Sequence, residues 1–321
     1  MTENKKIFLT GGAGFIGTKL CSVLSESNDV MIYDNLKRNS IQNTTLLEKP
    51  NVQLFEGDIL DSNRLEAAVR LFDPDIVVHL AAIAGIDTVI RSPVQTMTVN
   101  MIGTYNVLSA LKKYAAHLER LINLSTSEVF GSYAYKVEEE STTNLQPVGE
   151  ARWTYAVSKL AGEHLAHSYY EEYRLPVVSV RPFNIYGPGQ VGEGAIHQFV
   201  VRAIQNEEIC VHGEGDQIRS WCYIDDLVSG LLLCMERKEA IGDFFNIGNP
   251  RGTITVSMLA QLVRKIANSS SVIRYVPKTY VDVELRIPSI EKARTKLGYQ
   301  PVFDLPSGLK KTIEWYRERL S

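Results

Sequence analysis

The chain has 321 residues, of which 45% are hydrophobic and 22% are charged, and its formal net charge at pH 7 is −3. This composition is typical of a soluble globular protein with a substantial core, and the small negative charge argues against a general attraction to nucleic acid. No stretch approaches the roughly eighteen uninterrupted apolar residues of a membrane-spanning helix, and no basic and then apolar leader precedes the first apolar run. We therefore expect a cytoplasmic protein with no nucleic-acid or membrane partner.

A glycine-rich turn follows the first predicted strand. Residues 6–10 form a short apolar run, followed by Gly-Gly-Ala-Gly-Phe-Ile-Gly at 11–17 and a helical pattern at 18–25. A strand, a glycine turn and a helix in this order are typical of a dinucleotide site. The glycines allow a tight turn, a close approach of the pyrophosphate and close helix packing, and the helix start offers free N–H groups to the phosphates. We assign this cofactor site to Gly11, Gly14, Phe15, Ile16 and Gly17.

Acidic residues end the next two predicted strands. Residues 30–33 form the second strand, and Asp34 follows it. A carboxylate at this position would accept hydrogen bonds from the adenosine ribose and repel a 2′-phosphate, which favours NAD over NADP. Residues 52–56 form the third strand. Asp58 comes just after it and would either cap the helix that begins near Asp61 or contact the adenine.

Strands and helices continue to alternate over about the first 180 residues. Further strands are predicted at 76–80, 121–124 and 177–180, with a long helix at 93–117. This alternation predicts an α/β fold with a doubly wound parallel Rossmann sheet, which binds its ligands at the carboxyl ends of the strands. The remaining cofactor-binding candidates lie near these ends and on the long helix: Asn35, Asp58, Ile59, Ala81, Ala82, Asn100, Ser125 and Pro182.

The strand at 121–124 ends in hydroxyl groups and one carboxylate, at Ser125, Thr126, Ser127 and Glu128. About twenty residues with the character of a loop follow, and then a helix that carries Tyr155 and Lys159 on the same face. An ammonium group beside a phenol favours the phenolate, a base suited to removing a proton from an alcohol. Taken alone, the pair fits an exposed helix surface equally well, and its place behind a dinucleotide motif favours catalysis.

The regular alternation stops after residues 181–188, and short helices and strands follow. We expect a smaller C-terminal substrate lobe that is interleaved with the sheet. Residues 1–183 and about 219–249 would form the NAD-binding domain, and about 184–218 and 250–321 the substrate lobe. Residues 192–194 predict a mobile loop and Glu138–Glu140 a solvated one.

No metal or disulfide site is predicted. His164 and His167 lie three apart on the Tyr155 helix but have no neighbour that would complete a metal site, so we expect them to face solvent. The cysteines are too widely spaced for a disulfide framework or a zinc site: Cys21, Cys210, Cys222 and Cys234.

Together these motifs resemble the extended short-chain dehydrogenase/reductase family, specifically its nucleotide-sugar epimerases, dehydratases and decarboxylases, from Ile7 to about Leu320. The resemblance implies that bound NAD takes a hydride from sugar carbon 4 while Tyr155 takes the hydroxyl proton. It also implies that Thr126 binds the same oxygen and that Lys159 holds the nicotinamide ribose and lowers the tyrosine pKa. The substrate-binding residues would be Asn184, Arg219 and Arg286, although a surface salt bridge would also account for Arg219.

The sequence Thr126-Ser127-Glu128 is similar to that of UDP-glucuronate decarboxylases and several 4,6-dehydratases, in which the carboxylate would move a proton or orient a uronate. Residues 152–155 and 284–290 resemble a decarboxylase, whereas residues 86–87 are closer to the dehydratases, and that region lacks an obvious carboxylate-binding arginine. The resemblance favours UDP-glucuronate decarboxylation by a homodimer formed through residues 98–117 and 155–173. Alternatives are 4,6-dehydration of a UDP- or dTDP-hexose, 4-epimerisation and, from another class, an NAD-binding sensor without catalysis.

Overall fold

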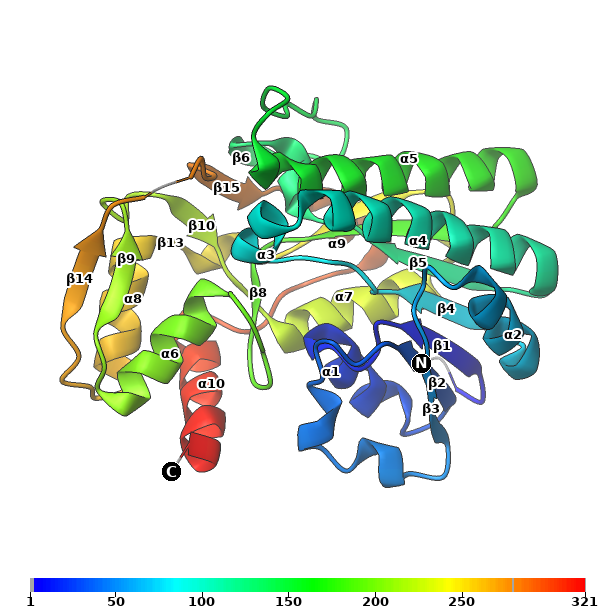
Figure 1. The fold of residues 1–321 in the computed structure, drawn as a ribbon, viewed down its shortest axis with the longest axis horizontal. Helices are drawn as coiled ribbons and strands as arrows, with labels where there is room; N and C mark the ends of the chain where they lie inside the picture. Colours follow the sequence, from blue (N-terminus) through cyan, green and yellow to red (C-terminus); the bar gives the residue numbers. More distant parts are fainter. Residues whose placement is uncertain (1–2, 279, 321) are drawn as a thin grey trace.

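The computed structural model describes residues 3–278 and 280–320. Its centre is a seven-stranded sheet in the order β12-β7-β5-β4-β1-β2-β3, in which all strand pairs are parallel (Figure 1). The strands are β1 (Lys6–Thr10), β2 (Asp29–Asp34), β3 (Val52–Glu56), β4 (Ile76–His79), β5 (Arg120–Leu124), β7 (Val177–Pro182) and β12 (Phe244–Ile247). The predicted doubly wound α/β sheet is confirmed.

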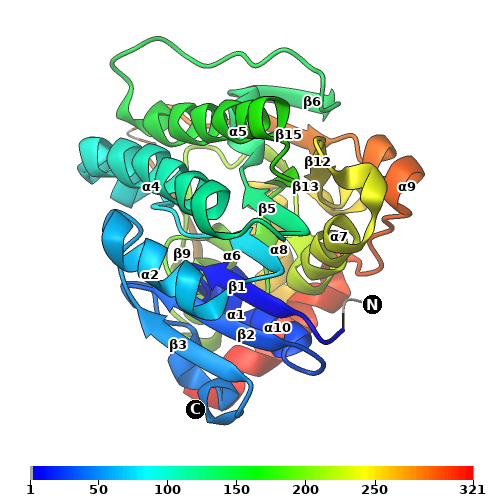
Figure 2. The ribbon, with the colours of Figure 1, turned by 90° about the vertical axis from the view of Figure 1, so that its right-hand side faces the viewer.

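Helices cover both faces of this sheet, so its strands are apolar on both sides (Figures 1 and 2). In β1, Phe8 packs in the core beneath α2 (Ser62–Phe72), α4 (Pro93–Tyr114) and α5 (Thr154–Tyr173). Ile7 and Leu9 point to the opposite face, where they join the core of α1 (Phe15–Leu24) and α7 (Ile224–Glu236). The two layers of helices thus fix the sheet in place, and the site lies at the carboxyl ends of its strands.

A smaller lobe contains a second sheet that the sequence did not predict, in the order β13-β10-β15-β6. Its strands are β13 (Thr253–Thr255), β10 (Ile218–Ser220), β15 (Leu285–Pro288) and β6 (Tyr133–Val137), the last in the stretch expected to be a loop. Beside it lie α6 (Ala195–Gln205), α8 (Val256–Ile266), α9 (Glu291–Leu297), α10 (Leu305–Leu320), and the pairs β9 (Ile209–His212) with β14 (Ile273–Val276) and β8 (Ile185–Tyr186) with β11 (Cys222–Tyr223). The domain boundaries stay a prediction.

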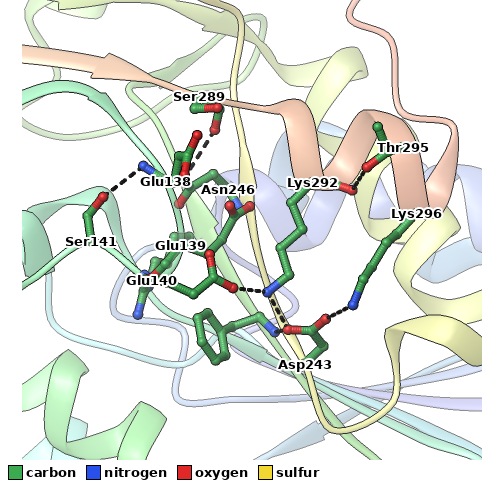
Figure 3. Close-up of polar contacts among 12 residues, drawn as sticks. Glu138, Glu139, Glu140, Ser141, Asp243, Asn246, Ser289, Lys292, Thr295 and Lys296 are labelled. Atoms are coloured by element: carbon green, nitrogen blue, oxygen red, sulfur yellow. Dashed lines mark hydrogen bonds and ion pairs between the residues drawn. The ribbon is translucent and has the colours of Figure 1, made fainter.

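The expected solvated loop at Glu138–Glu140 is wrong for Glu139, which is only 3% exposed. One carboxylate oxygen of Glu139 accepts the backbone N–H of Asn246 in β12, at 2.7 Å. Glu140 meets the ammonium group of Lys292 in α9 at 2.8 Å, and that group also contacts Asp243 (Figure 3). Tertiary contacts thus anchor a segment whose composition alone indicates exposure.

Within residues 3–278 and 280–320, the structure contains no helix that is both long and apolar enough to cross a bilayer. Over the same residues, no three His, Cys, Asp or Glu side chains are grouped as a metal site would need. His164 and His167 are exposed on α5, as predicted.

Candidate active site

The glycine turn between β1 and α1 lies directly against the end of β4. Gly11 has a φ of +70°, and a Cβ there would lie 2.5 Å from the backbone nitrogen of Ala81. A Cβ on Gly17 would lie 2.5 Å from the Cα of Gly12, so α1 packs on the turn without a side chain between them. Gly14 precedes α1 without a side-chain cap, which leaves the first N–H groups of the helix available to a phosphate. Phe15 and Ile16 begin the helix.

Asp34 braces this turn from the end of β2. Its carboxylate is 8% exposed and accepts the N–H groups of Ala13, at 3.0 Å, and Leu36, at 2.7 Å. Burial raises the pKa of Asp34, and these backbone hydrogen bonds act in the opposite direction. Because each carboxylate oxygen can accept more than one hydrogen bond, the predicted contact with the ribose remains compatible with this bracing role.

Asp58 does not cap α2, so that alternative is wrong. The cap is Asp61, whose carboxylate accepts the N–H of Arg64 at 3.0 Å. Asp58 accepts the N–H of Leu60 and a hydrogen bond from the amide of Asn35, both at the rim of the predicted adenosine site. The adenine contact stays a prediction. Ile59 is buried next to this turn.

Asn100 on α4 fixes the backbone that follows β4. Its side-chain oxygen accepts the N–H of Ile83 at 2.8 Å, and its amide nitrogen donates to Ile83 O and to the hydroxyl of Ser158 on α5. This observed role is to position the stretch containing Ala81 and Ala82, whereas a direct cofactor contact stays a prediction.

Three of the predicted catalytic residues meet at the carboxyl end of β5. Thr126 caps the short helix η3 (Ser127–Phe130) by accepting the N–H of Glu128 at 3.2 Å. A hydrogen bond also joins Thr126 to Tyr155, near the start of α5. Ser127 is buried in the same turn. The structure thus brings a hydroxyl, a phenol and a carboxylate together from two separate segments of the chain.

In the protein without NAD, the phenol of Tyr155 is not acidic, and the lowering of its pKa by Lys159 stays a prediction. Burial and then the negative charge of Glu128 raise the pKa of Tyr155 to about 12, whereas Thr126, Arg38 and Arg152 lower it. The two raising effects are larger than the three lowering ones. A base at this position therefore depends on further positive charge near the phenol.

Lys159 is itself a buried cation. Burial lowers its pKa to about 8, although Glu163 raises it. The hydroxyl of Ser125, at the end of β5, is buried without a hydrogen-bond partner among the residues that the structure describes. A bound dinucleotide would supply a partner for this hydroxyl, and the glycine turn, Asp34, Ser125 and Lys159 together fit NAD.

Arginines from separate segments of the chain surround Glu128. We call Arg152, Arg219 and Arg286, with Glu128 and Asp282, the arginine cluster. Arg152 binds Glu128 through two hydrogen bonds of 2.5 and 3.1 Å, and Arg286 approaches Glu128 to 3.5 Å. Burial raises the pKa of Glu128, but Arg152 and Arg286 outweigh it and bring the pKa to about 2.

Arg219 also belongs to this buried cluster, so the surface salt bridge offered as its alternative is wrong. It is 8% exposed and meets Asp282 at 3.2 Å. Arg219 and Arg286 are paired residues on the adjacent strands β10 and β15. Asn184, directly before β8, donates to the carbonyl of Ser220, the residue after Arg219, at 2.9 Å.

The arginine cluster has three guanidinium groups and two carboxylates, which leaves one excess positive charge. The Nε atoms of Arg152 and Arg286 are buried and have no hydrogen-bond partner within the described ranges. Unpaired cationic donors of this kind suit an anionic ligand group. Sequence reasoning did not assign Arg152 a role, although its position three residues before Tyr155 on a helical segment places the two near one another.

A glycine-rich loop from the smaller lobe reaches back to the large sheet. The carboxylate of Glu193 in this loop accepts the backbone N–H groups of Asp87 and Thr88 and the hydroxyl of Thr88. These residues begin α3 (Ile86–Arg91), a helix that the sequence did not predict. The stretch expected to be a mobile loop at 192–194 is therefore tied to the start of α3.

The chain is similar in sequence and in structure to proteins that act on nucleotide sugars. The model of the NAD dependent epimerase/dehydratase family matches residues 7–248. UDP-glucuronic acid decarboxylase 3 of Arabidopsis thaliana is 34% identical over 99% of this chain and 91% of its own length. dTDP-D-glucose 4,6-dehydratase of Homo sapiens is 32% identical over 98% of this chain and 90% of its own length. The structure of UDP-glucuronic acid 4-epimerase from Bacillus cereus, in complex with UDP-glucuronic acid and NAD, superposes with a TM-score of 0.88 at 29% identity, over 98% of this chain and 99% of that one.

Proposed function

Because this chain belongs to the NAD-dependent epimerase/dehydratase family and is an enzyme that uses NAD, we propose that it decarboxylates UDP-glucuronate through transient oxidation at sugar carbon 4. The observation that carries this proposal is the excess positive charge of the arginine cluster beside Tyr155. An acidic sugar would place its carboxylate where Arg152 and Arg286 keep unpaired donors.

In the first step, Tyr155 removes the proton of the carbon 4 hydroxyl, and Thr126 holds the same oxygen by a hydrogen bond. NAD, when bound, accepts the hydride from carbon 4 and later returns it. Lys159, which is buried, would bind the nicotinamide ribose and add positive charge on this side of the site. The resulting ketone lies β to the sugar carboxylate.

In the second step, the bond between carbon 5 and the carboxylate carbon breaks, and carbon dioxide leaves. The electron pair of that bond moves into an enolate whose oxygen is on carbon 4. Tyr155, now a neutral phenol, and Thr126 stabilise this oxygen by donating hydrogen bonds. A proton then adds to carbon 5, and reduction of the ketone completes the reaction.

The state of Glu128 favours decarboxylation over the alternatives. A 4,6-dehydration would need a group that gives and takes a proton near carbons 5 and 6. Glu128, with a pKa of about 2 and two arginine neighbours, remains ionised near neutrality and is poorly suited to donate one. Dehydration of a UDP- or dTDP-hexose is the second candidate, because a dehydratase is among the relatives at a similar level of identity. Epimerisation at carbon 4 is the third.

Product analysis separates these reactions. The NAD-loaded protein is incubated with UDP-glucuronate, UDP-glucose, UDP-N-acetylglucosamine and dTDP-glucose, and the products are identified by mass. Loss of carbon dioxide indicates decarboxylation, loss of water indicates dehydration, and an unchanged mass with new stereochemistry indicates epimerisation. The proposal fails if UDP-glucuronate is returned unaltered while another sugar is converted.

Two tyrosine variants test the catalytic base and exclude a sensor without catalysis. Tyr155→Phe removes the phenolic oxygen and should abolish conversion. Tyr135→Phe makes the same change on β6, where the side chain is 58% exposed, and should leave conversion unchanged. Full turnover by Tyr155→Phe would exclude Tyr155 as the base.

We also propose that the enzyme is a cytoplasmic homodimer formed through the outer faces of α4 and α5. Ile102 and Tyr105 on α4 and Val157 on α5 are large apolar side chains that are 40–50% exposed in the single chain. Light scattering after size exclusion should give twice the chain mass, and Tyr105→Glu should reduce it to that of one chain. A monomeric wild-type protein would contradict this arrangement.

A further inference from the structure

Arg152 has the geometry of a residue that acts on catalysis through another side chain. It lies in the short helix η4 (Ala151–Trp153), directly before α5, and faces Glu128 across the site. We propose that Arg152 is the positioning residue for Glu128, holding its carboxylate in one orientation and offsetting its negative charge at the phenol of Tyr155. This inference rests on the proposed role of Tyr155 as the catalytic base.

The contact between Arg152 and Glu128 fixes an orientation as well as a distance. Nη1 of Arg152 donates to Oε2 of Glu128 at 2.5 Å, and Nη2 donates to Oε1 at 3.1 Å. Two parallel bonds of this kind set the plane of the carboxylate, which a lysine cannot do. Arg286 approaches a single oxygen at 3.5 Å, so it contributes charge but does not set that plane.

Arg152 is in turn held on several sides. Its side chain is 4% exposed, its Nη2 lies 3.5 Å from Asp282, and its guanidinium group lies 5.3 Å from the ring centroid of Trp153. Because Arg152 directly precedes α5, the helix that carries the base also holds the carboxylate. Thr126 completes a closed set of contacts, since it binds both the N–H of Glu128 and the phenol of Tyr155.

The charges of Glu128 and Arg152 have opposite effects on Tyr155. Glu128 raises the pKa of Tyr155, and Arg152 lowers it. The other charged groups around Glu128 are Arg219 on β10, Arg286 on β15 and Asp282 before β15, and none of them precedes the base on its own helix. Arg38 also lowers the pKa of Tyr155, and Arg219 and Arg286 also offset the charge of Glu128. Removing Arg152 would therefore leave less of the Glu128 charge offset at Tyr155, whereas removing both partners would restore the balance.

The reaction's pH dependence tests this arrangement with the NAD-loaded enzyme. The variants are Arg152→Met, Arg152→Lys, Glu128→Gln and the double variant Arg152→Met with Glu128→Gln. The sugar is whichever nucleotide sugar the enzyme converts, so failure of the UDP-glucuronate assignment does not affect the test. The measured quantity is the pH at which kcat/KM rises as Tyr155 loses its proton.

Arg152→Met should move this rise to higher pH by about one unit, Glu128→Gln should move it to lower pH by about one unit, and the double variant should return close to wild type. Arg152→Lys keeps the positive charge but cannot make the two parallel hydrogen bonds to Glu128, so the rise should stay at the same pH while kcat falls. If Arg152 and Glu128 only stabilised the fold, these variants would lower the activity but would not change the pH at which kcat/KM rises.

A direct titration of Glu128 provides a second measurement that needs no sugar. The carboxyl carbon of Glu128 is followed by carbon-13 NMR in Arg152→Met, and its signal is identified by its absence from the double variant. This carboxyl group should titrate within the pH range in which Arg152→Met is folded. The inference is overturned if Glu128 stays ionised throughout that range and the pH rise of kcat/KM does not move. If Arg152→Met does not fold, Glu128→Gln decides, because an unmoved pH rise in that variant also overturns the inference.

Discussion

Replacing Lys159 by methionine should make the protein more stable near neutral pH while it removes catalysis. Lys159 is 5% exposed, and burial lowers its pKa from 10.5 to about 8, although Glu163 raises it. One pKa unit corresponds to about 1.4 kcal/mol, so keeping the ammonium group charged in the folded protein costs about 3 kcal/mol near pH 7. Methionine has a similar length and no charge, and it should recover most of this free energy.

The effect has a defined pH dependence. Because folding lowers the proton affinity of Lys159, the unfolded chain binds more protons than the folded chain between about pH 8 and pH 10.5. The free energy of unfolding of the wild type should therefore rise with pH across this window. The advantage of Lys159→Met should fall from about 3 kcal/mol near pH 7 to about 1 kcal/mol near pH 10.

Urea denaturation followed by circular dichroism, without added NAD, measures this difference. Lys310→Met serves as the control, because the Lys310 side chain is 71% exposed on α10, and it should leave stability nearly unchanged at both pH values. The reasoning is refuted if Lys159→Met is no more stable than wild type near pH 7. It is also refuted if the advantage is the same at the two pH values.

Three further predictions concern the turn, a buried ion pair and the loop at Glu193. Gly11→Ala would place a Cβ 2.5 Å from a backbone nitrogen and should abolish NAD binding in a fluorescence titration. Gly298 has a similar φ, but a Cβ there would have no atom within 4 Å. Gly298→Ala should therefore bind NAD normally, and its free energy of unfolding in urea should fall by about 1 kcal/mol. Glu163→Gln removes the charged partner of the buried Arg181 and should lower the free energy of unfolding by about 3 kcal/mol. Glu291→Gln, at an exposed ion pair, should leave the urea midpoint unchanged. Equal effects of the two variants would contradict the argument from burial. Glu193→Gln weakens the tie to α3 and should release NAD several-fold faster in a competition experiment; an unchanged rate would show that the loop does not retain the cofactor.

The large sheet could be predicted because each of its strands is a local apolar run bounded by turn residues. The predicted strands at 6–10 and 52–56 match β1 and β3, and the other predicted strands differ from the observed ones by at most two residues at either end. The residues at their carboxyl ends, from Gly11 to Thr126, could be placed in one region from topology alone. Tyr155 and Lys159 were found because their four-residue spacing is a local property of a helix.

The smaller sheet could not be predicted in this way, because β10, β13 and β15 have only three or four residues and the sheet pairs strands that are far apart in the sequence. Tyr133 and Tyr135 of β6 are exposed on either side of the buried Ala134, a two-residue alternation that could have indicated the strand. The arginine cluster depends on this sheet, since pairing of β10 with β15 brings Arg219 beside Arg286. Its effect on the pKa of Glu128 therefore became visible only in three dimensions.

The central claim is that Tyr155 starts an oxidation at sugar carbon 4 that is reversed before the product leaves. UDP-glucuronate carrying deuterium at carbon 4, given to the NAD-loaded enzyme in ordinary water, tests it most directly. We predict a decarboxylated product that keeps deuterium at carbon 4, formed more slowly than from the unlabelled sugar because the carbon 4–deuterium bond is broken, and formed by the wild type and not by Tyr155→Phe. A product with ordinary hydrogen at carbon 4, or undiminished product from Tyr155→Phe, would contradict the account.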